Sequence, residues 1–161
     1  MDQNNICCVE FHPEKWDGKT LEWKDKLFIK ETVPTLFHIP FPPMIGSKIT
    51  KMSKTAEDAK AMPENKEEVL ILFRDPSAFR SELYFSVTKE IPGADNAKIS
   101  GTFVSKVFDG SYNAIPKFIK EMDAHLASSG KKAKDYYVHY AYCPKCAKKY
   151  QHNYVLLFAE V

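Results

Sequence analysis

The sequence has 161 residues, of which 44% are hydrophobic and 27% charged, and its 23 basic and 21 acidic side chains leave a net charge of +2. A chain of this length can bury the core of one full domain. The balanced charge argues against nucleic acid or an acidic membrane as a partner, and no apolar run approaches the ~18 residues of a membrane span. Because the N-terminal stretch lacks the basic and apolar regions of a secretory signal, we expect a cytoplasmic protein.

The first half of the chain begins with an irregular lead, residues 1–25. The stretch "KLFIKETVPTLFHIP" predicts a strand that Pro34 bends or interrupts, because proline cannot donate a hydrogen bond to a neighbouring strand. A helix is expected over Ile45–Met62, where apolar side chains recur at steps of four and three residues until Pro63. Two short strands follow, "EEVLILF" and "ELYFSVTKEIP", with the turn "RDPS" between them.

The second half repeats this order of elements. "AKISGTFVSKVF" predicts a strand, and Asn113–Ala127 a helix with Asn113 as its N-cap and Gly130 as its C-cap. "DYYVHYAY" and "NYVLLFAEV" predict two more strands. The sequence therefore predicts an α+β fold of two β-α-β-β units, at about 26–91 and 97–161, with an antiparallel sheet and helices packed on one face.

The run "ELYFSVTKEIPGADNAKISGTFVSKVFDGSYNAIPKFIKEMDAHL", followed by "DYYVHYAYCP" and "YVLLFAEV", resembles the GyrI-like or effector-binding domain family. It is most similar to small stand-alone members with a cysteine pair near each end, sometimes labelled hydrolases. The resemblance implies a single GyrI-like domain over residues 26–161. In that fold the two β-α-β-β units form a bowl with an aromatic cleft along their junction.

The resemblance also implies two classes of function. Relatives fused to DNA-binding domains sense lipophilic or cationic drugs, but residues 1–25 are too few to hold a helix-turn-helix. In drug-sensing members an acidic residue lies in a strand of the form "YEIY", and Val138 takes its place here. We therefore expect a stand-alone protein that holds a lipophilic or aromatic ligand in a cleft between the two units. The alternative is a small hydrolase of the cyclopropanoid cyclohydrolase type, acting on electrophilic or strained-ring compounds.

A site for such a ligand needs rings that offer contact area at low entropic cost, and a few polar groups for orientation. For each ring the alternative is a place in the core, which is usual for aromatic residues in half-buried strands. His139 is also the candidate catalytic residue, since an unperturbed pKa of ~6.5 suits a general base; a structural histidine is the alternative. The ligand-binding candidates are Tyr84, Phe103, Lys106, Tyr112, Tyr137, His139, Tyr140, Phe158 and Trp23.

Alternation along "DYYVHYAY" sorts these candidates into two faces. Tyr137 and His139 share one face, and Tyr136, Val138 and Tyr140 share the other. One face must meet the helices, and the alternation alone does not say which.

The four cysteines are candidates for a zinc site. Cys143 and Cys146 have the spacing that puts two thiolates on one metal, and Cys7 and Cys8 would complete a tetrahedral site if the lead packs beside the last hairpin. Thiols without metal, or a disulfide or redox pair, are the alternatives. A redox pair needs a helix after its first cysteine, where we expect a hairpin loop. No motif for phosphate, dinucleotide, zinc-protease or serine-hydrolase chemistry is present.

Overall fold

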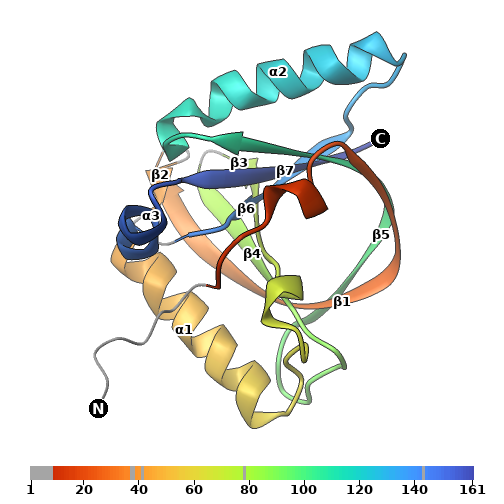
Figure 1. Ribbon diagram of the computed structural model, residues 1–161. Helices are drawn as coiled ribbons and strands as arrows, with labels where there is room; N and C mark the ends of the chain where they lie inside the picture. The colour runs from red at the N-terminus through yellow and green to blue at the C-terminus, as the bar shows by residue number, and fades with distance from the viewer. Residues whose placement is uncertain (1–8, 37–38, 41, 78, 143) are drawn as a thin grey trace. The chain divides into compact units, whose positions relative to one another are not determined.

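A computed structural model describes residues 9–36, 39–40, 42–77, 79–142 and 144–161, which form seven strands and three α-helices (Figure 1). The chain divides into two compact units, residues 23–101 and residues 1–22 with 102–161. Apart from a two-residue strand (Ile39–Pro40) and a short helix (Pro144–Tyr150), each unit has a strand, a helix and two further strands in that order, all paired antiparallel. The predicted α+β fold with duplicated β-α-β-β units is therefore confirmed.

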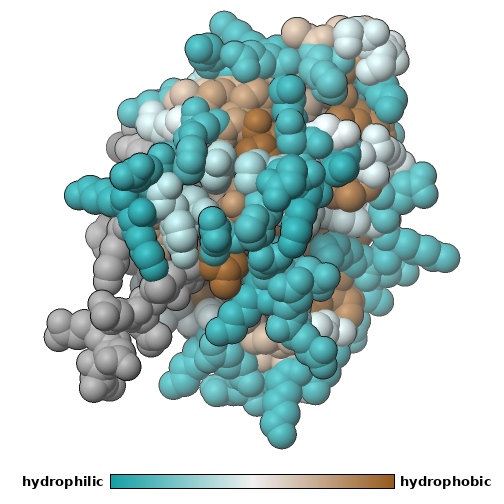
Figure 2. Space-filling view, viewed as in Figure 1, coloured by the Kyte–Doolittle hydropathy of each residue, from teal (hydrophilic) through white to brown (hydrophobic). Residues whose placement is uncertain are grey.

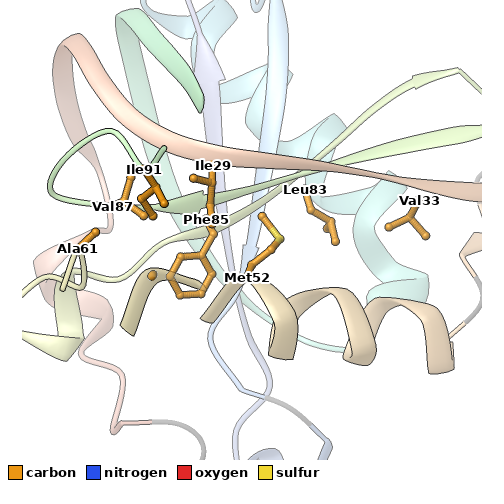
Figure 3. Close-up of a cluster of buried hydrophobic side chains, with 9 residues drawn as sticks. Ile29, Val33, Met52, Ala61, Leu83, Phe85, Val87 and Ile91 are labelled. Carbon is orange, nitrogen blue, oxygen red and sulfur yellow. The ribbon is translucent and has the colours of Figure 1, made fainter. Parts of the chain in front are cut away.

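The unit of residues 23–101 packs α1 (Pro42–Asp58) against one face of its sheet. The sheet order is β2 (Ile39–Pro40), β1 (Lys19–Leu36), β4 (Arg80–Ser86) and β3 (Ile71–Ser77), and the 3-10 turn η2 (Lys66–Glu68) precedes β3. Figure 3 shows α1 and the strands contributing side chains to one apolar cluster. This core contains Ile29, Val33, Met52, Ala56, Ala61, Leu83, Phe85, Val87 and Ile91.

The other unit uses β7 (Tyr154–Glu160) as the middle strand between β5 (Asn96–Asp109) and β6 (Asp135–Tyr140). Helix α2 (Ile115–Ser128) covers one face of this sheet, after the short turn η3 (Tyr112–Ala114). The core beneath α2 contains Val104, Phe108, Phe118, Met122, Leu126, Val155, Leu157 and Ala159. The unit also contains η1 (Pro13–Lys15) and α3 (Pro144–Tyr150).

The two long helices are close to their predicted bounds. α1 runs over Pro42–Asp58 instead of Ile45–Met62. α2 begins after Ala114 as its N-cap, one residue beyond the expected Asn113. Beyond its C-terminus, Gly130 has a φ of 71° and its N–H donates to the Ala127 carbonyl at 3.0 Å. Glycine suits this left-handed position because it has no Cβ, but the C-cap itself is Ser129, one residue before the expected Gly130.

Pro34 does not interrupt the first strand, which corrects one prediction. β1 continues through Pro34, which pairs with Arg80 of β4. Thr35 N–H donates to the Phe79 carbonyl at 3.0 Å, on the β4 side. Because successive backbone N–H groups point to opposite sides of a strand, the nitrogen of Pro34 points away from β4 and removes no bond of that ladder. β1 also begins at Lys19, inside the lead that was expected to be irregular.

The second correction concerns the stretch after Cys143. We expected a hairpin loop there, but Pro144–Tyr150 forms the helix α3. Proline at the first helical position has its φ already set for a helix and loses no hydrogen bond, because the first N–H groups of a helix have no partner within it. The connection between β6 and β7 therefore contains seven helical residues.

The visible surface is mostly hydrophilic, and hydrophobic residues show only in small separate areas (Figure 2). Among the described residues the large apolar side chains with the greatest exposure are Phe79, at 61%, and Val9, at 41%. No helix in the described ranges is long and apolar enough to cross a membrane.

Candidate ligand-binding faces

Aromatic rings gather on the sheet face of β5, β7 and β6 that α2 does not cover. Val104, Val138 and Leu157 pack beneath α2, so alternation turns their neighbours to the opposite face. We call this surface, formed by Phe103, Tyr137, His139 and Phe158, the β7 face. Phe158 pairs directly with Tyr137, and Tyr137 meets Phe103 edge-on with ring centroids 5.9 Å apart and planes at 71°. Edge-to-face contact is a favoured geometry for aromatic pairs.

Residues 16–18 of the lead lie along the β7 face and are held there by hydrogen bonds to β5. Trp16 packs edge-on against Phe158, with centroids 5.9 Å apart. The hydroxyl of Ser105 donates to the Trp16 carbonyl, and the Ser105 carbonyl accepts from Gly18 N–H at 3.0 Å. Asp17 accepts from Val107 N–H, also at 3.0 Å. Ser105 is 0% exposed, so the lead satisfies a polar group that would otherwise be buried at a cost.

His139 lies half-buried on the β7 face, and its ring centroid is 6.5 Å from that of Phe11. A second histidine lies in the same unit, where His152 Nδ1 is 2.8 Å from the carboxylate of Asp109. This hydrogen bond lowers the pKa of Asp109 below its ordinary value, although partial burial acts in the opposite direction. Tyr154 stacks on the His152 ring at 4.7 Å. Carboxylate contact at Nδ1 orients the imidazole, which is the usual role of a carboxylate beside a histidine.

The unit of residues 23–101 has a comparable surface, which we call the β4 face: Phe28, Lys30, Arg74, Glu82 and Tyr84. It lies opposite α1, because Ile29, Leu83 and Phe85 pack with that helix. Phe28 meets Tyr84 edge-on at 6.1 Å, and Trp23 lies 6.1 Å from Phe28. These rings form a continuous row.

A buried carboxylate lies at the end of this row of rings. Glu82, whose side chain is 6% exposed, is 2.8 Å from Lys30 Nζ and 2.7 Å from Arg74 Nη1. It also accepts a hydrogen bond from the Tyr84 hydroxyl at 3.1 Å. Burial raises the pKa of Glu82, but the bonds from Lys30, Arg74 and Tyr84 outweigh it and lower the pKa below the ordinary value. Glu82 is therefore ionised at neutral pH.

The structure divides the predicted site residues into three groups. Phe103, Tyr137, His139 and Phe158 share the β7 face, while Tyr84 and Trp23 lie in the unit of residues 23–101. Lys106 and Tyr140 lie on the α2 side of their sheet, where Lys106 Nζ is 5.8 Å from the Phe108 ring and Tyr140 packs against the core. Tyr112 begins η3, and its side chain lies outside the described part. Ligand contact by each of these residues, and its predicted position in the cleft, stay predictions.

Sequence reasoning missed the ion cluster around Glu82. Alternation in "ELYFS" puts Glu82 and Tyr84 on the same side of β4. A charged residue within an otherwise apolar strand indicates a buried ion pair, because charged side chains are almost never fully buried unless they are paired. Its partners Lys30 and Arg74 belong to two other strands, β1 and β3. Only strand pairing brings them together.

Three of the four predicted zinc ligands, Cys7, Cys8 and Cys143, lie outside the described residues. Cys146 lies in α3 and is 3% exposed. Within the described part of the chain, no group of three or more His, Cys, Asp or Glu side chains is placed to hold a metal ion. The zinc site stays a prediction.

The duplicated β-α-β-β fold is that of GyrI-like effector-binding proteins, and three solved structures share it. The EcmrR C-terminal domain has a TM-score of 0.63 at 12% identity, covering 90% of this chain and 96% of that domain. A hydrolase from Listeria innocua has a TM-score of 0.60 at 10% identity, with 89% and 91% coverage. SAV2435 bound to tetraphenylphosphonium has a TM-score of 0.54 at 11% identity, with 90% and 93% coverage. At such identities the likeness shows the fold alone.

Family membership is more specific than the fold. The bacterial hydrolase family matches residues 1–161, and the chain belongs to this family. No curated protein is significantly similar to it.

Proposed function

We propose that this protein binds a lipophilic or aromatic small molecule on its ring-bearing sheet faces. The observation that carries the proposal is repeated in both units: a helix covers one face of each sheet, and the opposite face carries rings in edge-on contact. Rings offer a ligand large apolar area with few rotatable bonds. The complex of SAV2435 with tetraphenylphosphonium, an aromatic and lipophilic ion, supports this class of ligand for a protein of the same fold.

Polar groups on the two faces would orient such a ligand. On the β7 face the candidate is His139, and on the β4 face the candidates are Glu82 and the hydroxyl of Tyr84. Sites for small molecules commonly combine an apolar lining with a few polar groups of this kind.

Hydrolysis of an electrophilic or strained compound is the second candidate function. The description of the family as bacterial hydrolases favours it. His139, half-buried beside aromatic rings, is the candidate general base. A hydrolase of this type would turn over an electrophilic cyclopropane with uptake of one water, and His139→Gln would abolish turnover while binding of a stable analogue persists. If His139→Gln turns over the compound as fast as the wild type, the general base is another residue.

The binding proposal is tested by fluorescence titration of the full chain with a planar aromatic dye. Tyr137→Ala should weaken binding by about 1–3 kcal/mol, the hydrophobic value of a buried aromatic side chain. Tyr140→Ala is the matched control, because this tyrosine belongs to the same strand but packs on the α2 side. If wild type and Tyr137→Ala bind the dye with equal affinity, and thermal melts show that both are folded, the β7 face is not part of the ligand-binding site.

A further inference from the structure

A histidine and an aspartate form an oriented pair at the point where β5 ends and β7 begins. His152 Nδ1 is 2.8 Å from Asp109 Oδ2. The other carboxylate oxygen, Oδ1, accepts a hydrogen bond from Asn153 N–H at 2.8 Å. Asp109 is the last residue of β5 and pairs with Tyr154, the first residue of β7. The carboxylate is therefore held at the end of a strand from both of its oxygens.

The bond to Asp109 determines which nitrogen of the imidazole carries the proton. The hydrogen bond with His152 is the first cause that lowers the pKa of Asp109 below its ordinary value, and Asn153 N–H acts in the same direction against partial burial. The carboxylate is thus ionised at neutral pH and can only accept hydrogen bonds. Nδ1 must then be the donor, so Nε2 of the neutral ring keeps the lone pair that can take a proton.

The imidazole is fixed in place but remains open to solvent. Tyr154 stacks on the His152 ring, with centroids 4.7 Å apart and planes at 14°, and Phe11 packs on Tyr154 at 5.4 Å. The side chains of His152 and Asp109 are nevertheless each 48% exposed. Phe103 and Phe158 of the β7 face are 0% exposed in comparison. Water and a dissolved substrate can therefore reach the histidine without displacing a core side chain.

We propose that His152 and Asp109 form a general-base dyad that activates water for the hydrolysis of small electrophilic compounds such as activated esters. Nε2 of His152 takes a proton from a water molecule while the oxygen of that water bonds to the carbonyl carbon. The ester C–O bond then breaks, and its electron pair goes to the leaving oxygen, which takes the proton from the imidazolium. Asp109 holds Nδ1–H and stabilises the imidazolium, so it is a positioning residue. One water molecule is consumed.

This inference rests on hydrolysis, the second candidate function, and it names a base other than His139. His139 lies within β6, where it pairs with Leu156 and is half-buried. His152 precedes β7 and has a carboxylate at Nδ1. A general base must reach a water molecule and keep one tautomer, and the geometry of His152 meets both conditions. The binding of a ligand to the ring-bearing faces does not depend on this assignment.

Hydrolysis of 4-nitrophenyl acetate by the full chain tests the proposal, with free imidazole at the same concentration as the background. His152→Gln should lower kcat/KM by about 100-fold, because positioned general bases contribute factors of this order. His125→Gln is the matched control, since His125 is an exposed histidine in the last turn of α2. It should hydrolyse the ester at the wild-type rate, whereas unspecific reaction with exposed imidazoles would be reduced in both variants.

Asp109→Asn distinguishes positioning of the base from structural support. An amide cannot stabilise the imidazolium, so kcat should fall by about tenfold or more. KM should change by less than about twofold, because Asp109 does not touch the substrate. Exposed pairs contribute little to stability, so thermal melts should show that both dyad variants are folded. His152→Asn replaces His152→Gln if the melt shows that the latter is unfolded.

The outcomes separate this inference from the hydrolase function. A loss of kcat/KM in His152→Gln that is absent in His125→Gln supports the dyad. If His152→Gln hydrolyses the ester as fast as the wild type, the dyad is overturned and the hydrolase function keeps another base. A loss confined to His139→Gln would identify that base. Hydrolysis by the wild type no faster than by free imidazole also overturns the dyad, and turnover of the cyclopropane then decides the hydrolase function separately.

Discussion

Trp16 meets Phe158 edge-on, with ring centroids 5.9 Å apart and planes at 87°. The two residues are far apart in the sequence, and the contact joins the N-terminal lead to the middle strand of the sheet. Phe158 is 0% exposed, and Ser105 holds the adjacent backbone by donating to the Trp16 carbonyl. Residues 9–22 of the lead are therefore part of the same packed unit as residues 102–161.

Trp16→Ala should destabilise the protein by about 1–3 kcal/mol, because it removes an aromatic pair and uncovers part of Phe158. The free energy of unfolding is measured by urea titration followed by circular dichroism. Lys15→Ala, at an exposed position of the same turn, is the control and should change stability by less than about 0.5 kcal/mol. A loss for Trp16→Ala no greater than that of the control would mean that the lead does not stabilise the sheet.

Glu82→Gln should destabilise the protein by about 1–3 kcal/mol at neutral pH, because Lys30 and Arg74 lose their charged partner. The pKa of Glu82 is lowered in the folded protein from its ordinary 4.5. Its contribution is thus fully present above pH 4.5 and is lost as the pH falls through the lowered pKa of the folded state. Stability of the wild type should decline in acid more steeply than that of Glu82→Gln.

Glu90→Gln is the control for the acid experiment. Glu90 is 3.5 Å from Lys98, and both side chains are more than half exposed. Exposed ion pairs contribute about 0–1 kcal/mol, so this variant should follow the wild type across the whole acid range. Parallel stability curves for wild type and Glu82→Gln between pH 7 and pH 2 would contradict the stabilising role of the ion cluster.

Gly110→Ala should destabilise the protein by about 1–3 kcal/mol through overpacking. A Cβ at Gly110 would lie 2.8 Å from the tip of the Phe118 ring, and that ring is stacked on Phe108 at 4.6 Å in the core beneath α2. Phe118 can move aside only by disturbing this stack. The change is measured as a fall in the melting temperature.

Gly46→Ala is the matched substitution on α1 and should act in the opposite direction. A Cβ at Gly46 meets nothing within 4 Å, and alanine favours a helix over glycine by about 0.5–1 kcal/mol. A rise in melting temperature for Gly46→Ala with a fall for Gly110→Ala is the expected pair of results. Destabilisation by both would show that the space around Gly46 is smaller than the structure indicates.

Periodicity in the sequence determined the order of the elements and the face of its helix or strand on which each side chain lies. The apolar steps of α1 and α2 and the alternation in "DYYVHYAY" are local patterns, because a side chain's direction follows from the geometry of its own helix or strand. They correctly separated Tyr137 from Tyr136 and Val138. The helix at Pro144–Tyr150 was missed because seven residues hold too few turns to show a period.

Tertiary structure decided which residues from distant segments meet. Strand pairing places Lys30, Arg74 and Glu82 side by side, and packing of the lead brings Trp16 to Phe158. Neither contact has a local pattern, because register depends on the free energy of the whole sheet and its core. The sequence by itself determined the two β-α-β-β units, whereas only the pairing of β1, β4 and β3 created the ion cluster at the end of the row of rings. The physical reason is that periodicity is a property of a few consecutive residues, whereas charges interact through space between residues that are distant in the sequence.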